Sequence, residues 1–174
     1  ENCFAEKRHA RRRVFRGLLL VGWGCLGGVL AADAASDPKP VRIVEAFPKL
    51  RFDMPLYITF PKDGTDRLFV VEQGGRVLVF ENRPDVEKAD VVIDLKEKVR
   101  RDHSEEGLLG LAFHPSFAKN HQVFLHYSAS DPRRNVLSRF KMDTQSGVID
   151  PSPEEVILEV KQPYGNHNGG MIEF

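Results

Sequence analysis

The order of short apolar runs along the chain is the feature that most constrains its fold. Four runs separated by turn residues occupy residues 56–60, 68–71, 76–80 and 91–95, and four more occupy residues 108–113, 122–127, 136–142 and 156–160. Phe60 aligns with Phe113 at a spacing of 53 residues. Phe80 aligns with Phe140 at a spacing of 60 residues. Helical periodicity is almost absent. Four strands that recur at this spacing are typical of β-propeller blades, so the sequence predicts an all-β fold.

The residues between the runs have the chemistry of turns. Pro61 and Gly64 belong to a turn in which the proline fixes φ and the glycine accepts a positive φ. Residues 73–75 (Gln-Gly-Gly) join two strand-like runs and predict a hairpin. His114 stands before Pro115 at the corresponding point of the second repeat. We expect it to shape a turn and not to bind a ligand.

A single blade cannot bury both of its faces, so blades pack on one another in a closed ring. A third copy of the repeat is expected to begin at Gly169. Two blades and a short third segment cannot close a ring, and we therefore expect the sequence to be the N-terminal part of a longer propeller. Val, Ile and Val alternate with polar residues in 41–47, which predicts an additional strand. The expected organisation is a signal peptide (1–34), a linker and first strand (35–54) and the propeller part (55–174).

The beginning of the chain has the composition of an export signal. Five arginines between Arg8 and Arg16 precede the apolar run Gly17–Leu30, and small residues follow, with cleavage expected after Ala31 or Ala34. The apolar run is shorter than the ~20 residues that a membrane-spanning helix needs, so no stable membrane span is expected. The sequence thus predicts an exported protein, periplasmic or secreted. A retained membrane anchor is the alternative.

Charge and cysteine content exclude several classes of function. The 25 basic and 25 acidic residues give a net charge of zero. This balance does not support a nucleic-acid partner, because phosphate binding needs a basic surplus on one face. Both cysteines, Cys3 and Cys25, fall within the expected leader. The part after the leader therefore has no disulfide, no cysteine metal site and no covalent haem attachment.

Two motifs carry the most specific information. Residues 105–115 read EEGLLGLAFHP and residues 166–170 read NHNGG. Together with residues 67–80 and 136–140 (VLSRF), they closely resemble the glucose/sorbosone dehydrogenase family, and the resemblance covers residues 55–174. The resemblance implies a six-bladed β-propeller, of which about the first two blades and the start of a third are present. It also implies a quinoprotein oxidoreductase that oxidises an aldose at its anomeric carbon to a lactone and passes the electrons to an external acceptor.

The family resemblance also implies the cofactors. These are pyrroloquinoline quinone (PQQ) and calcium, with the calcium ligands and most of the quinone ligands expected beyond Phe174. Within the sequence we assign no metal ligand and no cofactor-binding residue. Relatives often carry a basic residue after the second glycine of the NHNGG position, where this chain has Met171. Loss of a cation beside an anionic quinone would weaken cofactor binding.

The same resemblance implies roles for three residues. His167 matches the general base that takes the proton of the substrate hydroxyl while hydride passes to the quinone, and a neutral imidazole suits this task because its pKa lies near working pH. Glu105 matches a position that lines the sugar pocket. Asn166 precedes the base, where some relatives carry Asp, and its amide can hydrogen-bond a sugar hydroxyl.

Other interpretations of these residues remain open at this stage. His167 could sit in a polar turn, and Glu105 could be a solvated carboxylate in the charged run 100–106. Asp102 and His103 could join Glu105 in a metal site, although a solvated loop is the expected state. Glycines at positions 107, 110, 169 and 170 are expected to permit bends and close strand approach. The main alternative function is a non-catalytic propeller that binds partners and resembles hedgehog-interacting proteins.

Overall fold

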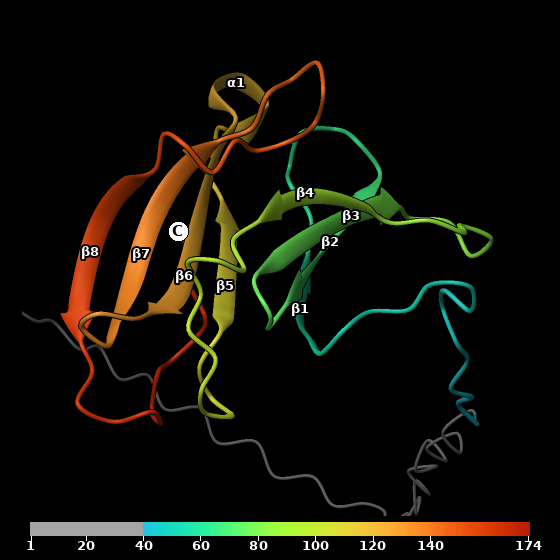
Figure 1. The fold of residues 1–174 in the computed structure, drawn as a ribbon. Helices are drawn as coiled ribbons and strands as arrows, with labels where there is room; N and C mark the ends of the chain where they lie inside the picture. The colour runs from blue at the N-terminus through green and yellow to red at the C-terminus, as the bar shows by residue number, and fades with distance from the viewer. Residues whose placement is uncertain (1–39) are drawn as a thin grey trace, which may run out of the picture. The chain divides into compact units, whose positions relative to one another are not determined.

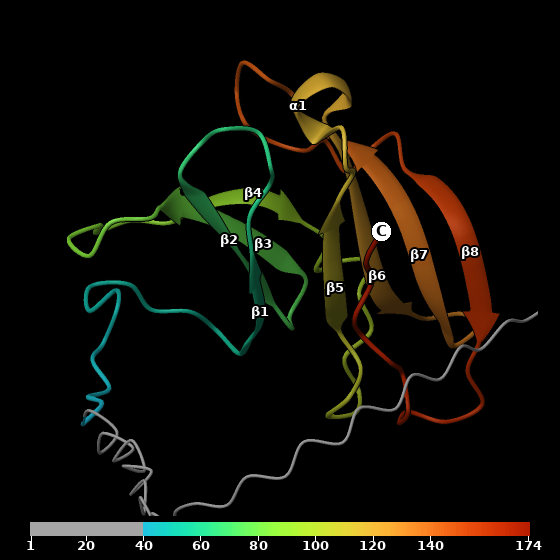
Figure 2. The same cartoon turned by 180° about the vertical axis from the view of Figure 1, so that it is seen from behind.

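Eight strands form two antiparallel four-stranded sheets in residues 40–174, the part of the chain that the computed structural model describes. The first sheet contains β1 (Pro55–Thr59), β2 (Arg67–Glu72), β3 (Arg76–Glu81) and β4 (Asp90–Asp94); the second contains β5 (Leu108–Phe113), β6 (Gln122–Ala129), β7 (Arg134–Lys141) and β8 (Glu155–Lys161). A short helix, α1 (Phe117–Asn120), lies between β5 and β6 in the sequence. Strands follow sequence order across each sheet (Figures 1 and 2). The predicted repeat of four strands is thereby confirmed.

The β2–β3 hairpin shows why the sequence folds as it does locally. Its register is continuous from Arg67, opposite Glu81, to Glu72, opposite Arg76. Gly75 closes the turn at φ +112, with its N–H donating to the carbonyl of Glu72 at 3.0 Å. A Cβ atom at Gly75 would lie only 2.9 Å from the backbone nitrogen of Lys96, so the position requires glycine for space as well as for conformation. The predicted hairpin is confirmed.

The main core lies between the two sheets. It joins buried residues of the first sheet, such as Phe69, with buried residues of the second, such as Leu108 and Leu125. Phe113 is central to this contact, because its ring packs edge-on against Phe69 at 4.9 Å between centroids and against Phe117 of α1 at 4.8 Å. Each such buried side chain contributes roughly 1.5–3 kcal/mol relative to an exposed one. The inner strands of the two sheets are therefore held as one unit.

The strand predicted at 41–47 is wrong. Residues 40–54 contain no strand, and Val41 and Ile43 are 96% and 98% exposed. The segment instead makes a turn, in which the N–H of Leu50 donates to the carbonyl of Phe47 at 3.1 Å. The ring of Phe47 packs edge-on against Phe80 at 4.9 Å. An alternating sequence does not by itself supply a neighbouring strand for hydrogen bonding. The packing of Phe47 against Phe80 holds this segment in place instead.

The last residues of the chain run beside the second sheet. Residues 169–174, where a third repeat was expected to begin, form no strand. The ring of Phe174 packs against Phe124 of β6, at 5.0 Å between centroids, and against His114, at 5.3 Å. Figures 1 and 2 both show this end of the chain next to β5 and β6. The segment thus begins to cover the face of the second sheet.

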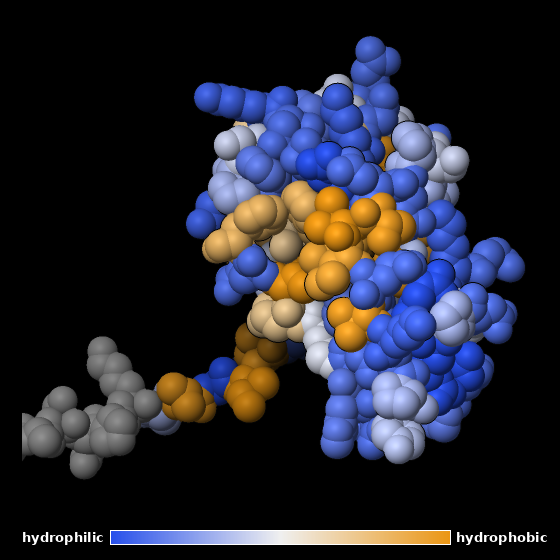
Figure 3. All heavy atoms as spheres, turned by 90° about the vertical axis from the view of Figure 1, so that its left-hand side faces the viewer, coloured by the Kyte–Doolittle hydropathy of each residue, from blue (hydrophilic) through white to orange (hydrophobic). Residues whose placement is uncertain are grey.

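Strand β8 is the outer edge of the second sheet, and every one of its residues is exposed. Val156 and Leu158 are 49% and 54% exposed, and Ile157 and Val160 are exposed to a similar extent. Figure 3 shows apolar surface gathered on the side of the molecule that carries β8. The second sheet is therefore only partly covered within the described residues.

The predicted signal peptide (1–34), with both cysteines, and the first linker residues lie outside the described part of the chain. Among residues 40–174, no helix is long and apolar enough to span a membrane.

Candidate functional site

One end of the two sheets collects the loops that carry the predicted site residues. Because the strands are antiparallel and in sequence order, the β2–β3 turn, the β4–β5 connection and the β6–β7 turn all lie at the same end, together with the segment that follows β8. We call this the site end; it is the lower end in Figure 1, whereas α1 lies at the opposite end. Glu105 belongs to the β4–β5 connection, and His167 to the segment after β8.

The structure brings Glu105 and His167 together. An oxygen of the Glu105 carboxylate, Oε2, accepts a hydrogen bond from the backbone N–H of His167 at 2.6 Å, across 62 residues of sequence. Both residues are exposed, and so is Asn166 beside them. A carboxylate can accept several hydrogen bonds, so Glu105 keeps acceptor capacity for a ligand hydroxyl. Three exposed polar residues are therefore brought together at the surface of the site end.

The backbone around His167 is held in an uncommon conformation. His167 has φ +61, a left-handed value that is uncommon for a residue other than glycine. The turn around it is held by Asn168, which is 5% exposed and donates from Nδ2 to the carbonyl of Gly165 at 2.9 Å. The carbonyl of Asn168 in turn accepts a hydrogen bond from Nδ2 of Asn135 on β7 at 2.7 Å.

Asn168 and Asn135 were both missed by the sequence reasoning. The sequence gives no clear signal for Asn135, because it follows two arginines and precedes the apolar run 136–142, at a position that turns out to be 7% exposed. A buried amide in a strand must find hydrogen-bond partners, and the loop at 165–168 supplies one.

Glycines allow the segment after β8 to approach its neighbours closely. A Cβ atom at Gly110 of β5 would lie 2.2 Å from the carbonyl oxygen of Gly170, and one at Gly165 would lie 2.2 Å from the ring of His103. Neither position has room for a side chain. The expectation that Gly110 permits close approach is confirmed. The loop of His167 therefore lies directly against β5 and the β4–β5 connection.

Within the charged run 100–106, Glu106 differs from its exposed neighbours and is buried. Its side chain is 0% exposed, and Oε1 lies 3.1 Å from Nε of Arg100 and 3.0 Å from Nε of Arg133. The other oxygen, Oε2, accepts hydrogen bonds from the backbone N–H groups of Asp102 and His103, both at 3.0 Å. A buried carboxylate persists only with such partners. Glu106 thus organises the loop that carries Glu105.

A partly buried histidine supports the same region. Burial lowers the pKa of His126 on β6, against the opposing effect of a hydrogen bond to the backbone of Gly170. Its Nδ1 is buried without a hydrogen-bond partner. The imidazole is therefore neutral at neutral pH and hydrogen-bonds the backbone of Gly170, close after His167.

The residues present fit the sugar-binding part of a quinone-dependent site better than its quinone-binding part. His167, Glu105 and Asn166 offer a base and hydroxyl-binding groups, as a sugar requires. At the position where relatives carry a cation, Met171 is 70% exposed, and the guanidinium groups of Arg100 and Arg133 are paired with Glu106. These arginines are therefore not free to pair with the quinone's carboxylates. Within residues 40–174, no group of three or more His, Cys, Asp or Glu could hold a metal ion, and this includes the acidic loop around Asp102.

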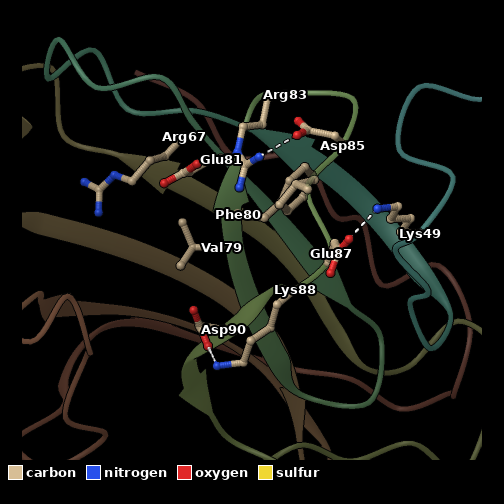
Figure 4. A pocket seen from close by; sticks show the side chains of 11 residues that line it. Lys49, Arg67, Val79, Phe80, Glu81, Arg83, Asp85, Glu87, Lys88 and Asp90 are labelled. Carbon is tan, nitrogen blue, oxygen red and sulfur yellow. Dashed lines mark hydrogen bonds and ion pairs between the residues drawn. The ribbon is translucent and has the colours of Figure 1, made fainter.

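A hollow lies at the end of the first sheet that is opposite to the site end. It is lined by β3 and the β3–β4 connection, and Figure 4 shows its charged side chains. Each of those side chains has an ion-pair partner, for example Arg83 with Glu81 and Asp85 at 2.7 and 2.9 Å, and Lys49 with Glu87. No unpaired charge is left there to select a ligand. At the same end, Nδ1 of His114 accepts the N–H of Ser116 at 2.9 Å, which confirms its predicted role in a turn.

Comparison with known proteins relates this arrangement to enzymes and to a binding protein. The sequence profile of the family described as Glucose / Sorbosone dehydrogenase matches residues 52–174. The human Hedgehog-interacting protein is 27% identical over 124 residues, which cover 64% of this chain and 18% of that protein. A crystal structure of glucose dehydrogenase matches with a TM-score of 0.54 and 18% identity, over 68% of this chain and 34% of the enzyme. Another glucose dehydrogenase matches with a TM-score of 0.50 and 19% identity, over 68% and 36%.

These matches show the architecture and its extent. The likeness to the two solved enzymes establishes that the two sheets are two blades of a β-propeller, as predicted. The chain spans about a third of the length of the solved relatives, and less than a fifth of the curated one.

Proposed function

The chain belongs to the glucose/sorbosone dehydrogenase family, and from this premise we propose that it is part of a quinoprotein oxidoreductase that oxidises an aldose or a related sugar hydroxyl. The observation that carries the proposal is the hydrogen bond from the backbone of His167 to the carboxylate of Glu105. It unites the two family motifs on one surface, although they are far apart in sequence. Exposed polar groups at the loop end of a propeller are suited to a small polar substrate.

In this proposal His167 is the general base. Its imidazole takes the proton from the hydroxyl on the anomeric carbon, and the hydrogen on the same carbon leaves as hydride with the electron pair of the broken C–H bond. The carbon–oxygen bond then becomes the carbonyl of a lactone. Neutral imidazole is suited to accept the proton at neutral pH. The exposed position of His167 leaves its ring open to a substrate.

Glu105 and Asn166 bind and orient the substrate. The carboxylate of Glu105 fixes the backbone of His167 and accepts a further hydrogen bond from a sugar hydroxyl. The amide of Asn166 donates to or accepts from a neighbouring hydroxyl. Because Asn carries no charge, this residue orients the sugar without stabilising a protonated His167, unlike the Asp of some relatives.

The family resemblance implies PQQ as the hydride acceptor and calcium as its support. PQQ, when bound, would take up the hydride and pass the electrons to an external acceptor. Among the described residues, His167, Glu105 and Asn166 would face the sugar beside it. The proposal also includes export to the periplasm or the exterior, which N-terminal sequencing of the mature protein would test through cleavage after Ala31 or Ala34.

The test uses the full-length protein with added PQQ and calcium, a panel of aldoses and a reducible dye. We expect turnover in the parent and a loss of about 100-fold or more in kcat for His167→Ala, because a general base contributes typically that much. His121→Asn is the matched control, since His121 lies at the opposite end, after α1, and has φ +56, which asparagine tolerates. Equal loss in both variants, or no turnover together with no quinone binding, would contradict the proposal.

A non-catalytic binding module is the second candidate function. The observation that favours it is the match to the human Hedgehog-interacting protein at 27% identity, together with Met171 in place of a cation. A module of this kind would use the same loops to bind a partner and would not need PQQ. Absorbance titration with PQQ separates the two candidates, because only the enzyme is expected to bind it.

A further inference from the structure

Two neighbouring glutamates of the β4–β5 connection have opposite environments. Glu105 is exposed, whereas Glu106 is fully buried between Arg100 and Arg133. Nε of each arginine lies within 3.1 Å of the same oxygen of Glu106, without the alignment of a hydrogen bond. The contact is therefore an attraction between charges, and both guanidinium groups, 19% and 23% exposed, are largely removed from water.

The remaining polar atoms of Glu106 close its own loop. Besides the two backbone N–H groups bound by Oε2, the N–H of Glu106 donates to the carbonyl of His103 at 3.1 Å. The carbonyl of Glu106 accepts from Nε2 of Gln73, in the β2–β3 turn, at 2.9 Å. Residues 102–106 are thus folded around one buried carboxylate. The direction in which Glu105 projects follows from this fold.

Arg133 connects this loop to the loop of His167. Its guanidinium pairs with Glu106, and its backbone carbonyl accepts the N–H of Gln162 at 3.1 Å. Gln162 directly follows β8 and begins the segment that leads to His167. The two loops that meet in the Glu105–His167 hydrogen bond therefore have a common support in Arg133.

We propose that Glu106 is a positioning residue which, through its pairing with Arg133 and Arg100, holds Glu105 against the backbone of His167. The inference deepens the proposed function and rests on it for the meaning of the two positioned residues. Its physical basis does not depend on turnover. Without the negative charge, the poorly solvated guanidinium of Arg133 loses its anion, Arg100 keeps only Asp102, and the loop 102–106 loses the carboxylate that accepts its backbone N–H groups.

The test is hydrogen exchange followed by mass spectrometry on the full-length protein. Glu106→Gln keeps the shape of the side chain and removes its charge. We expect exchange in peptides covering 102–106 and 164–170 to rise about tenfold or more, while peptides of β6 keep parent rates. Arg133→Gln leaves Glu106 paired with Arg100, so exchange in the same peptides should rise by a smaller factor. This variant tests the proposal if Glu106→Gln does not fold.

The matched control is Glu159→Gln on β8. Glu159 pairs with Arg134, the residue next to Arg133, at 2.7 Å, but it is exposed and its charge contacts neither loop. We expect its exchange pattern to equal that of the parent. If Glu106→Gln opened only residues 102–106, or opened all peptides equally, the positioning role would be overturned.

A double-mutant cycle separates positioning from general loop stability. Glu105→Gln weakens the contact with His167 directly. If Glu106 acts through Glu105, adding Glu106→Gln to Glu105→Gln should change exchange at 164–170 by clearly less than it does in the parent. Additive effects would overturn the proposal.

Sugar turnover gives an independent readout in the same proteins. With turnover in the parent, kcat/KM should fall in Glu106→Gln and not in Glu159→Gln; equal values for all three proteins would overturn the positioning role. A parent with no turnover would contradict the proposed function alone, and the exchange results would still decide whether Glu106 positions Glu105.

Discussion

Both ends of the propeller blades carry ion pairs, but the pairs at the two ends differ in how far they are buried. At the site end, Arg100 and Arg133 converge on one carboxylate, Glu106, that is 0% exposed. At the opposite end, Arg83 and Asp85 form a pair whose members are 52% and 72% exposed (Figure 4). Exposed pairs contribute little because water and salt screen them, whereas breaking a buried pair leaves a charge that nothing solvates. The difference teaches that burial, and not the number of charges, decides which pairs organise a site.

The largest effect is expected where this comparison is broken at the buried end. Glu106→Gln should lower the free energy of unfolding by about 3 kcal/mol or more, because it leaves the poorly solvated guanidinium of Arg133 without its anion and Arg100 with Asp102 alone. Urea denaturation of the full-length protein measures this change. An unchanged urea midpoint would show that the Glu106 cluster is solvated and that the two ends do not differ.

Close backbone packing is a second property of the site end. Gly110→Ala would place a Cβ atom 2.2 Å from the carbonyl of Gly170, and the segment after β8 would have to move away from β5. We expect a loss of about 1–3 kcal/mol, as for other overpacked positions, together with reduced activity if His167 is the base. Gly74→Ala is the control, because its Cβ would meet only the end of the Arg101 side chain, at 3.4 Å. Similar losses in both variants would contradict this interpretation.

A smaller effect is expected from acid at the same end. Burial lowers the pKa of His126 in the folded protein below its usual value of 6.5. A group whose pKa is lower in the folded than in the unfolded state contributes stability that is present above the unfolded pKa and is lost as pH falls through the folded value. The melting temperature should therefore decline below about pH 6.5 more steeply in the parent than in His126→Gln. If the melting temperatures of the two proteins declined in parallel, protonation of His126 would not contribute to the loss of stability in acid.

The sequence could predict the blades because their signal is local. Apolar runs such as 68–71 and 76–80, joined by a Gly-Gly turn, contain within one hairpin everything that fixes its register. The segment 41–47 has the same alternation without a partner, and there the prediction was wrong. Alternation indicates that a segment can form a strand, but a partner decides whether it does.

The candidate site could be predicted only in part, because its contacts join distant residues. The resemblance of two motifs identified Glu105 and His167, but not the hydrogen bond between them. The sequence assigned no role to Glu106, because its neighbours in sequence are charged and nothing distinguishes it from them. Its burial depends on Arg133, which belongs to the β6–β7 turn, and no residue near Glu106 in the sequence indicates that the two side chains pair. Buried ion pairs are tertiary features, and a single sequence does not pair their members.

The smallest effect is expected at the opposite end of the sheets. Arg83→Met removes the central cation of the exposed hollow, where Glu81 and Asp85 raise the pKa of Arg83. Both carboxylates can turn to water once the arginine is gone, so no measurable change in the urea midpoint is expected, either at low or at moderate salt. The measurement should run beside Glu106→Gln under the same conditions. A loss comparable to that of Glu106→Gln would show that something other than burial separates the two ends, and the physical basis for assigning a positioning role to Glu106 would then fail with it.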